Sequence, residues 1–190
     1  MVKLSLINKA LTPDKICSID ASTNSLAFAI FHFGKLVSFG KIAFEGKNIF
    51  EKVRDAARKT GQLLNNFEID AIVIEHTVFL NSPKTMNDLA MVQGALLGSS
   101  GIRKIKTINP IAWQTFLGNG KLTKEEKSRI RRENPGKSDS WYKAFERDFR
   151  KNRTIKVINI EYDVDNFDND VADAIGIGHY AISNWEKLGD

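Results

Sequence analysis

The sequence predicts an α/β protein with a mixed central sheet flanked by helices, and three features of its 190 residues support that prediction. Three short apolar segments lie close together between residues 16 and 44, as in an antiparallel meander. Residues 69–74 form a nearly continuous apolar and β-branched run, which is typical of a buried strand. Segments with helical spacing of apolar residues separate the later strands. Together they predict a layered fold, formed by a single domain over residues 1–190.

The first half of the chain is expected to supply the meander, one helix and the buried strand. The meander strands are expected at residues 16–19, 26–33 and 36–44, joined by tight turns such as Gly34-Lys35. Asn48 is a suitable N-cap for a helix over residues 49–67, where apolar positions recur at roughly helical spacing. The buried strand follows this helix directly and ends at Glu75.

The second half is expected to alternate helices with more exposed strands. Helices are expected at residues 86–97, from Pro110 onward and at 168–185, and strands at 102–108 and 155–160. Residues 121–152 are highly charged and are interrupted by Asn134-Pro135-Gly136, which predicts two short helices around a turn.

Positive charge is concentrated in one segment of the chain. Residues 121–153 contain twelve Lys and Arg against six Asp and Glu, a balance of +6, whereas the whole chain carries +5. Because lysine and arginine contact phosphates, this pattern predicts a basic helical insertion that binds DNA, the alternative being an ordinary solvated helix. The expected contact residues there are Lys121, Lys124, Lys127, Arg131 and Arg132.

Other residues near this charge have alternative explanations. Lys104 and Lys106 alternate along a predicted strand and could face DNA, although an ordinary exposed strand would show the same pattern. Trp141, Phe145 and Phe149 are spaced four residues apart, so they share one helical face, which favours packing over base stacking.

The composition excludes several classes of protein. No apolar run approaches the ~20 residues that a membrane span needs. The N-terminus has a lysine where a secretory signal would be apolar, so we expect no signal peptide. Cys17 is the only cysteine, which excludes an intramolecular disulfide and a cysteine-based zinc site. A reducing cytoplasm fits this cysteine usage.

Four carboxylates are the candidates for chemistry. Asp20 stands near the end of the first strand and Glu75 at the end of the buried strand, so they meet if those strands are neighbours. Asp170 and Asp173 are three residues apart in the last predicted helix and share a face. Ionised carboxylates that converge in this way need cations between them, and their hard oxygens suit Mg²⁺ or Mn²⁺. The alternative is that the strand ends are solvated and the helical pair compensates the helix dipole.

The sequence around these acids resembles the RuvC-type Holliday junction resolvases of the ribonuclease H-like superfamily. The first motif is IDAS at 19–22 followed by LAFAI at 26–30, and the second is IVIEHTVF at 72–79. The third is DVADAIGIGH at 170–179. Gln93-Gly94 and Asn109-Pro110 also resemble the family, and the resemblance covers roughly residues 15–118 and 155–185.

The resemblance implies a ribonuclease H-like fold and a homodimeric, metal-dependent endonuclease that nicks Holliday junctions and other branched DNA. It implies that Asp20 bridges two Mg²⁺ ions, that Glu75 and Asp173 each bind one side of the pair, and that Asp170 completes the set. Mn²⁺ is expected to substitute. Two-metal hydrolysis of this kind leaves a 5′-phosphate and a 3′-hydroxyl.

The chain also departs from the family pattern. Ala21-Ser22 stands where the family usually has Pro-Gly, and the basic segment is longer than in bacterial members, which favours a divergent, phage-encoded relative. Bacterial members carry an aromatic residue three positions after the second-motif Glu. Phe79 is four positions after Glu75 and is the expected counterpart for stacking on junction bases.

Two other functions are compatible with parts of the sequence. One is a branched-DNA-binding module without catalysis, which would not need all four carboxylates. The other is a phosphotransferase of the actin-like and sugar-kinase group, because residues 20–25 resemble its first phosphate loop. That group also needs a second domain and a glycine motif for adenosine, for which 190 residues leave no room.

Overall fold

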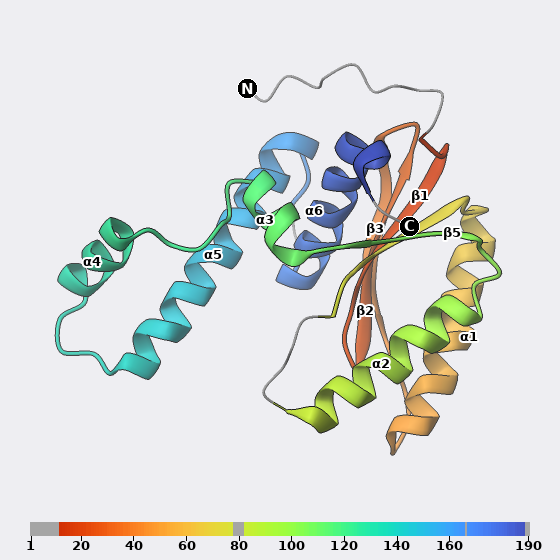
Figure 1. Cartoon of the computed structure of the whole chain (residues 1–190), viewed down its shortest axis with the longest axis horizontal. Coiled ribbons are helices and arrows are strands. Elements are labelled where there is room, and N and C mark those ends of the chain that lie inside the picture. Colours follow the sequence, from red (N-terminus) through yellow and green to blue (C-terminus); the bar gives the residue numbers. More distant parts are fainter. Residues whose placement is uncertain (1–11, 78–81, 166, 189–190) are drawn as a thin grey trace.

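The computed structural model describes residues 12–77, 82–165 and 167–188 and, within them, a five-stranded mixed sheet of order β3-β2-β1-β4-β5 (Figure 1). The strands are β1 (Lys15–Ala21), β2 (Ser25–His32), β3 (Lys35–Ala43), β4 (Ala71–Glu75) and β5 (Lys104–Ile108). Strands β1, β2 and β3 pair antiparallel, whereas β1 pairs parallel with β4 and β4 with β5. The predicted meander and the predicted mixed sheet are both confirmed.

Helices cover both faces of this sheet (Figure 1). On one face, α1 (Ile49–Phe67) and α2 (Pro83–Gly98) pack against alternate residues of the central strands, including Cys17, Ile19, Ile72 and Ile74. On the other face, α6 (Asn169–Asn184) and α3 (Pro110–Phe116) cover the intervening positions, among them Ile16, Ala71 and Val73. The chain ends its described part in the short 3-10 helix η1 (Trp185–Lys187). The nearly uninterrupted apolar run of β4 follows from this burial on both sides.

The expected helix boundaries are set by side-chain caps. Asn48 is the N-cap of α1, as predicted, and accepts a hydrogen bond from the Glu51 backbone N–H. Helix α2 begins three residues earlier than expected, because Ser82 caps it and Pro83 occupies its first turn. Asp168 caps α6 by accepting from the Val171 N–H.

The predicted strand at residues 155–160 is wrong, because this segment belongs to α5 (Asp139–Tyr162). Its β-branched residues favoured a strand, yet Thr154 and Ile158 are fully buried four residues apart while Ile160 is 86% exposed. That is helical periodicity. Packing of α5 on α6 therefore overrides the local preference, and the helix ends where Asp163 adopts a left-handed conformation.

The basic insertion is helical, as predicted, and extends away from the sheet (Figure 1). We call residues 121–153 the arm; it consists of α4 (Lys124–Glu133), a turn and the first part of α5. Leu122, Ile130 and Tyr142 form a small buried cluster of its own, against which the predicted aromatic face of α5 packs. The rings of Trp141 and Phe145 stack with centroids 5.0 Å apart. The packing interpretation of these aromatics is confirmed.

Across the described ranges, none of the helices combines the length and the apolar character that crossing a membrane requires.

Candidate active site

Strand alternation brings Asp20 and Glu75 to the same face of the sheet. Successive residues of a strand point to opposite faces, and the residues flanking Asp20 and Glu75, Ile19 and Ile74, pack on the α1–α2 side. Both acids therefore face α6. Strands β1 and β4 are parallel neighbours, with Ile19 paired to Ile74. Asp20 and Glu75 are the next residues of these strands, so they lie side by side at the same end of the two strands. The predicted meeting of these strand ends is confirmed.

A buried serine fixes α6 against this edge. Ser18, two residues before Asp20, is fully buried, and its Oγ donates to the carbonyl of Ala174 at 2.7 Å. Gly178 allows the close approach, because a Cβ there would lie 2.6 Å from Ser18 Oγ and 2.1 Å from the Phe31 ring. This contact sits directly after Asp173 in the sequence and holds Asp173 near Asp20.

The carboxyl groups interact strongly. Burial, and then the charges of Glu75 and Asp170, raise the pKa of Asp20 to about 7. Burial, and then the charge of Asp20, raise the pKa of Asp173 to about 8. Burial also raises the pKa of Glu75, against the effect of a hydrogen bond from Trp113. At neutral pH the chain alone therefore retains protons among these acids, which is the expected behaviour of a carboxylate cluster without a counter-cation.

Glu75 is held from two sides. The indole Nε1 of Trp113 donates to Glu75 Oε2 at 2.6 Å. On the other side, the Gln93 amide donates to the Glu75 backbone carbonyl at 3.4 Å, and Thr77 Oγ1 donates to Gln93 at 2.6 Å. Gln93 was noted in the sequence for its resemblance to the family, and it lies against the strand that carries Glu75.

Asp170 differs from the other three acids. Lys41 of β3 forms ion pairs with Asp170 at 2.5 Å and with Asp168 at 2.9 Å. These hydrogen bonds raise the pKa of Lys41, so the ammonium stays charged. Asp170 shares the helical face of Asp173, as predicted, but its charge is already balanced by a lysine.

Lys151 is a site residue that the sequence analysis did not identify. It lies on α5 close enough to Asp20 and Asp173 to lower the pKa of both, against the larger effect of burial. The signal for its position was present, because Lys151 precedes the buried Thr154 and Ile158 by three and seven residues. The incorrect strand at residues 155–160 concealed that helical face.

Two of the acids border a pocket of about 100 Å³, which is lined by Asp20, Ala21, Glu75, His76, Thr77, Leu89 and Gln93. Within the described ranges, no group of three or more His, Cys, Asp or Glu side chains is arranged to hold a metal ion. Lys41 binds Asp170, and Trp113 binds one oxygen of Glu75. The donor set nevertheless fits a hard divalent cation, because it consists of buried carboxylates that repel one another.

The predicted DNA-contacting residues fall into three groups. Phe79 lies outside the described residues. Lys104 is the first residue of β5 and pairs with Ala71, at the end of β4 opposite Glu75. The Lys106 ammonium donates to the Leu188 carbonyl at 3.1 Å. The remaining five lie on the arm.

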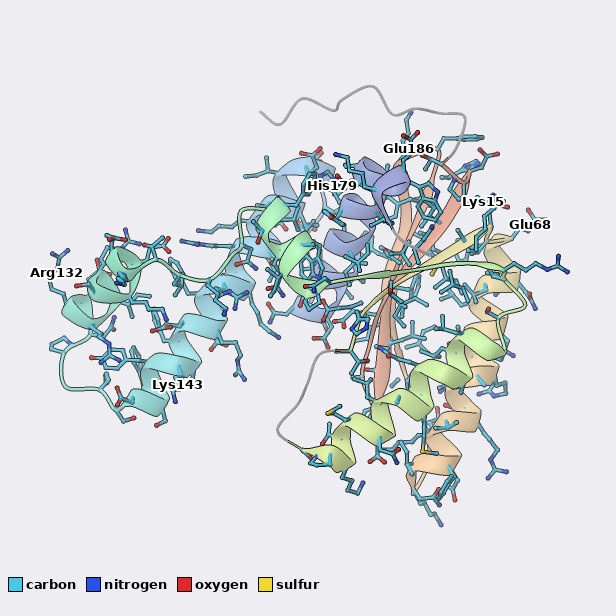
Figure 2. All side chains as sticks on the ribbon, in the orientation of Figure 1. Lys15, Glu68, Arg132, Lys143, His179 and Glu186 are labelled. Atoms are coloured by element: carbon cyan, nitrogen blue, oxygen red, sulfur yellow. The ribbon has the colours of Figure 1, made fainter. Side chains whose placement is uncertain are left out.

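Ion pairing divides these five arm residues. Lys127 pairs with Glu146 at 3.4 Å and Arg131 with Asp139 at 3.1 Å. Lys121, Lys124 and Arg132 are exposed and form no ion pair within the described part of the chain. Figure 2 shows Arg132 and Lys143 on the arm, away from the sheet.

Comparison with known proteins relates the chain to junction resolvases. No protein-family model matches it. A curated relative, the crossover junction endodeoxyribonuclease RuvC of Aliarcobacter butzleri (strain RM4018), is 31% identical over 121 residues, which cover 59% of this chain and 77% of the relative.

Solved structures share the fold. Thermus thermophilus RuvC, in complex with a Holliday junction substrate, superposes with a TM-score of 0.63 at 13% identity, covering 91% of this chain and 95% of that one. The yeast mitochondrial Holliday junction resolvase Ydc2 gives a TM-score of 0.53 at 11% identity, with 93% and 81% covered. The sheet and its helices have the ribonuclease H-like fold of these proteins, as predicted.

Proposed function

Because the chain belongs to the RuvC family of crossover junction endodeoxyribonucleases, we propose that it is a structure-selective endonuclease that nicks Holliday junctions and other branched DNA. The observation that carries this proposal is the convergence of Asp20, Glu75 and Asp173 at one edge of the sheet, where the charge of Glu75 raises the pKa of Asp20 and the charges of Asp20 and Glu75 raise that of Asp173. Burying several like charges together costs folding free energy. A role in binding cations for phosphodiester hydrolysis would explain why the chain has this cluster.

The metal part of the proposal assigns Asp20, Glu75, Asp170 and Asp173 to two Mg²⁺ ions, for which Mn²⁺ substitutes. When bound, such ions lower the pKa of a water molecule and neutralise charge on the phosphate. Asp20 and Asp173, whose pKa values are raised in the chain alone, would hold the ions as deprotonated carboxylates. Asp170, which forms an ion pair with Lys41, would complete the ligand set.

The reaction is hydrolysis of a phosphodiester. The oxygen of a water molecule forms a bond to phosphorus in line with the P–O3′ bond, which breaks, and the leaving oxygen takes a proton. The products carry a 5′-phosphate and a 3′-hydroxyl. Lys151 offers a positive charge beside the carboxylates, where it favours the approach of the phosphate. Glu75 is oriented by Trp113 and by the Gln93–Thr77 pair behind its backbone.

Substrate binding is assigned to the arm, on the basis of its charge. Lys121, Lys124 and Arg132 contact phosphates directly, whereas Lys127 and Arg131 must first loosen their ion pairs. Phe79, Lys104 and Lys106 remain predicted contacts. Two chains form a homodimer, since two symmetric nicks in a four-way junction require two sites. The arm and the sheet serve as one nuclease domain.

The test is cleavage of labelled four-way junction, fork and linear duplex DNA in Mg²⁺, in Mn²⁺ and in EDTA. Paired symmetric nicks in the junction, absent in EDTA, are the expected result. Cleavage of every branched form would place the chain among broader debranching nucleases. Binding of the junction without cleavage in either metal would contradict the proposal and favour a DNA-binding module that does not cleave.

A further inference from the structure

Trp113 is a buried aromatic residue with a direct bond to the proposed active site. It lies in α3 and is 1% exposed. Its indole Nε1 donates to Glu75 Oε2 at 2.6 Å, a short hydrogen bond for a nitrogen donor, as is usual when the acceptor is a carboxylate. Oε1 of Glu75 has no hydrogen-bond partner among the described residues.

The chain path explains why an indole reaches this carboxylate. Strand β5 is the parallel neighbour of β4, with Ile108 paired to Glu75, and the His76 N–H donates to the Ile108 carbonyl at 2.8 Å. Helix α3 begins two residues later, where Asn109 caps it and Pro110 occupies its first turn. The first turn of α3 therefore lies over the end of β4 that carries Glu75.

The same indole also rests against the helix that carries Asp173. Gly176 follows Asp173 by three residues, about one turn of α6. A Cβ at Gly176 would lie 3.0 Å from Trp113 Cζ3 and 2.8 Å from Leu117 Cδ1. Because Gly176 has no side chain, the Trp113 ring can pack directly against the backbone of α6. One ring thus touches α6 and binds Glu75, so it links the two halves of the carboxylate cluster.

We propose that Trp113 is a positioning residue: its N–H holds Oε2 of Glu75 so that Oε1 faces the proposed cation site. This inference rests on the proposed function for its effect on cleavage, but the hydrogen bond and its influence on Mg²⁺ binding are measurable without cleavage. Partners that orient a ligand in this way commonly change metal affinity or activity by about 10–100-fold.

The first test substitutes Trp113→Phe, which keeps an aromatic ring and removes the N–H. The matched control is Trp185→Phe, because Trp185 belongs to the same apolar cluster and bonds no carboxylate among the described residues. We expect Trp113→Phe to lower kcat about 10–100-fold, with junction Kd changed less than twofold. Trp185→Phe is expected to keep kcat at a temperature where both variants are folded. Equal kcat in the two variants would reduce Trp113 to a packing residue.

The second test needs no substitution at Trp113. The chain has three tryptophans, so the ¹H–¹⁵N spectrum should contain three indole signals. We expect Glu75→Gln to move the Trp113 indole proton upfield, because a neutral acceptor replaces a carboxylate, while the Trp141 and Trp185 signals stay in place. Mg²⁺ titration should shift the Trp113 signal in wild type and need about tenfold more Mg²⁺ in Glu75→Gln.

The two readouts separate the inference from the proposed function. An indole signal that responds to Glu75→Gln and to Mg²⁺, in a protein that cleaves no junction, would support the positioning role and overturn the nuclease assignment. A Trp113 signal unaffected by both, in a protein that cleaves junctions, would overturn the positioning role alone.

Discussion

Asp20 and Asp173 carry the largest electrostatic cost in the described part of the active site. Burial, and then repulsion by neighbouring carboxylates, raise their pKa values to about 7 and about 8, so the folded chain binds protons that the unfolded chain would release. Since the folded state binds more protons between roughly pH 4 and pH 8, its stability in the absence of metal falls as the pH rises through that range. A divalent cation would remove this penalty by replacing the protons.

This reasoning predicts that Asp173→Asn stabilises the chain in EDTA. Relative to wild type, the gain should be on the order of a few kcal/mol at pH 8 and should vanish below about pH 3, where Asp173 is protonated in both states. Denaturant unfolding at several pH values measures it. Mg²⁺ at pH 8 should stabilise wild type and not the variant, and Asp14→Asn, at the opposite sheet edge, serves as control. A gain independent of pH would show that Asp173 does not titrate as described.

At the same scale, the sequence selected four acids as candidates but did not predict the contacts that the structure shows for them. Alternation along β1 and β4 was sufficient to bring Asp20 and Glu75 together, because both strands have alternating burial against two helical layers. The Trp113–Glu75 bond depends on α3 following β5 directly, and the Lys41–Asp170 pair depends on β3 lying beside α6. Neither contact has a local sequence signal.

Among the helices, the arm shows how one charged segment serves two purposes. Thr123 and Glu126 form a capping box at the start of α4, and Arg153 pairs with Glu126. The Tyr142 hydroxyl donates to the Asn134 carbonyl at 2.5 Å, which closes the turn before α5. These contacts stabilise the arm internally, so only the unpaired cations remain for a polyanion.

The arm therefore yields a prediction about the salt dependence of junction binding. Replacing Lys121, Lys124 and Arg132 with Gln should weaken binding and lower the slope of log Kd against log salt by about 2 to 3, or nearly 1 for each lost phosphate contact. The control replaces Lys35, Arg103 and Lys187 with Gln, which removes the same charge far from the arm and the carboxylates. Fluorescence anisotropy at several salt concentrations compares them. An equal slope in both triple variants would exclude the arm from the phosphate contacts.

The prediction of helices and strands succeeded where apolar periodicity and a capping residue agreed. It failed where the secondary-structure preference of the residues opposed their packing in the fold. Asn48 and the apolar spacing of residues 49–67 gave the bounds of α1. In residues 155–160, β-branched side chains favoured a strand, but burial of Thr154 and Ile158 against α6 favoured the helix. Tertiary packing decided that segment, and single-sequence preference could not include it.

In the whole molecule, the catalytic candidates lie at one edge of a mixed sheet, and much of the positive charge lies on the arm, which extends beyond that sheet (Figure 1). The chain belongs to the family of its curated relative, and its fold is shared with Thermus thermophilus RuvC. The arm carries a charge balance larger than that of the entire chain. Lys151 is the arm residue that lies beside the carboxylates. The other arm cations are assigned to substrate attraction, so substitutions at Lys121, Lys124 and Arg132 should leave the carboxylate cluster intact.

The most direct test of this account compares wild type with Asp20→Asn on a labelled four-way junction in Mg²⁺, at equal junction occupancy. The substitution removes a ligand charge without altering the arm. The account predicts a junction Kd within twofold of wild type and a cleavage rate lower by more than about 100-fold, beyond the effect of losing an outer-shell partner. Cleavage at the wild-type rate would contradict the assignment of the active site.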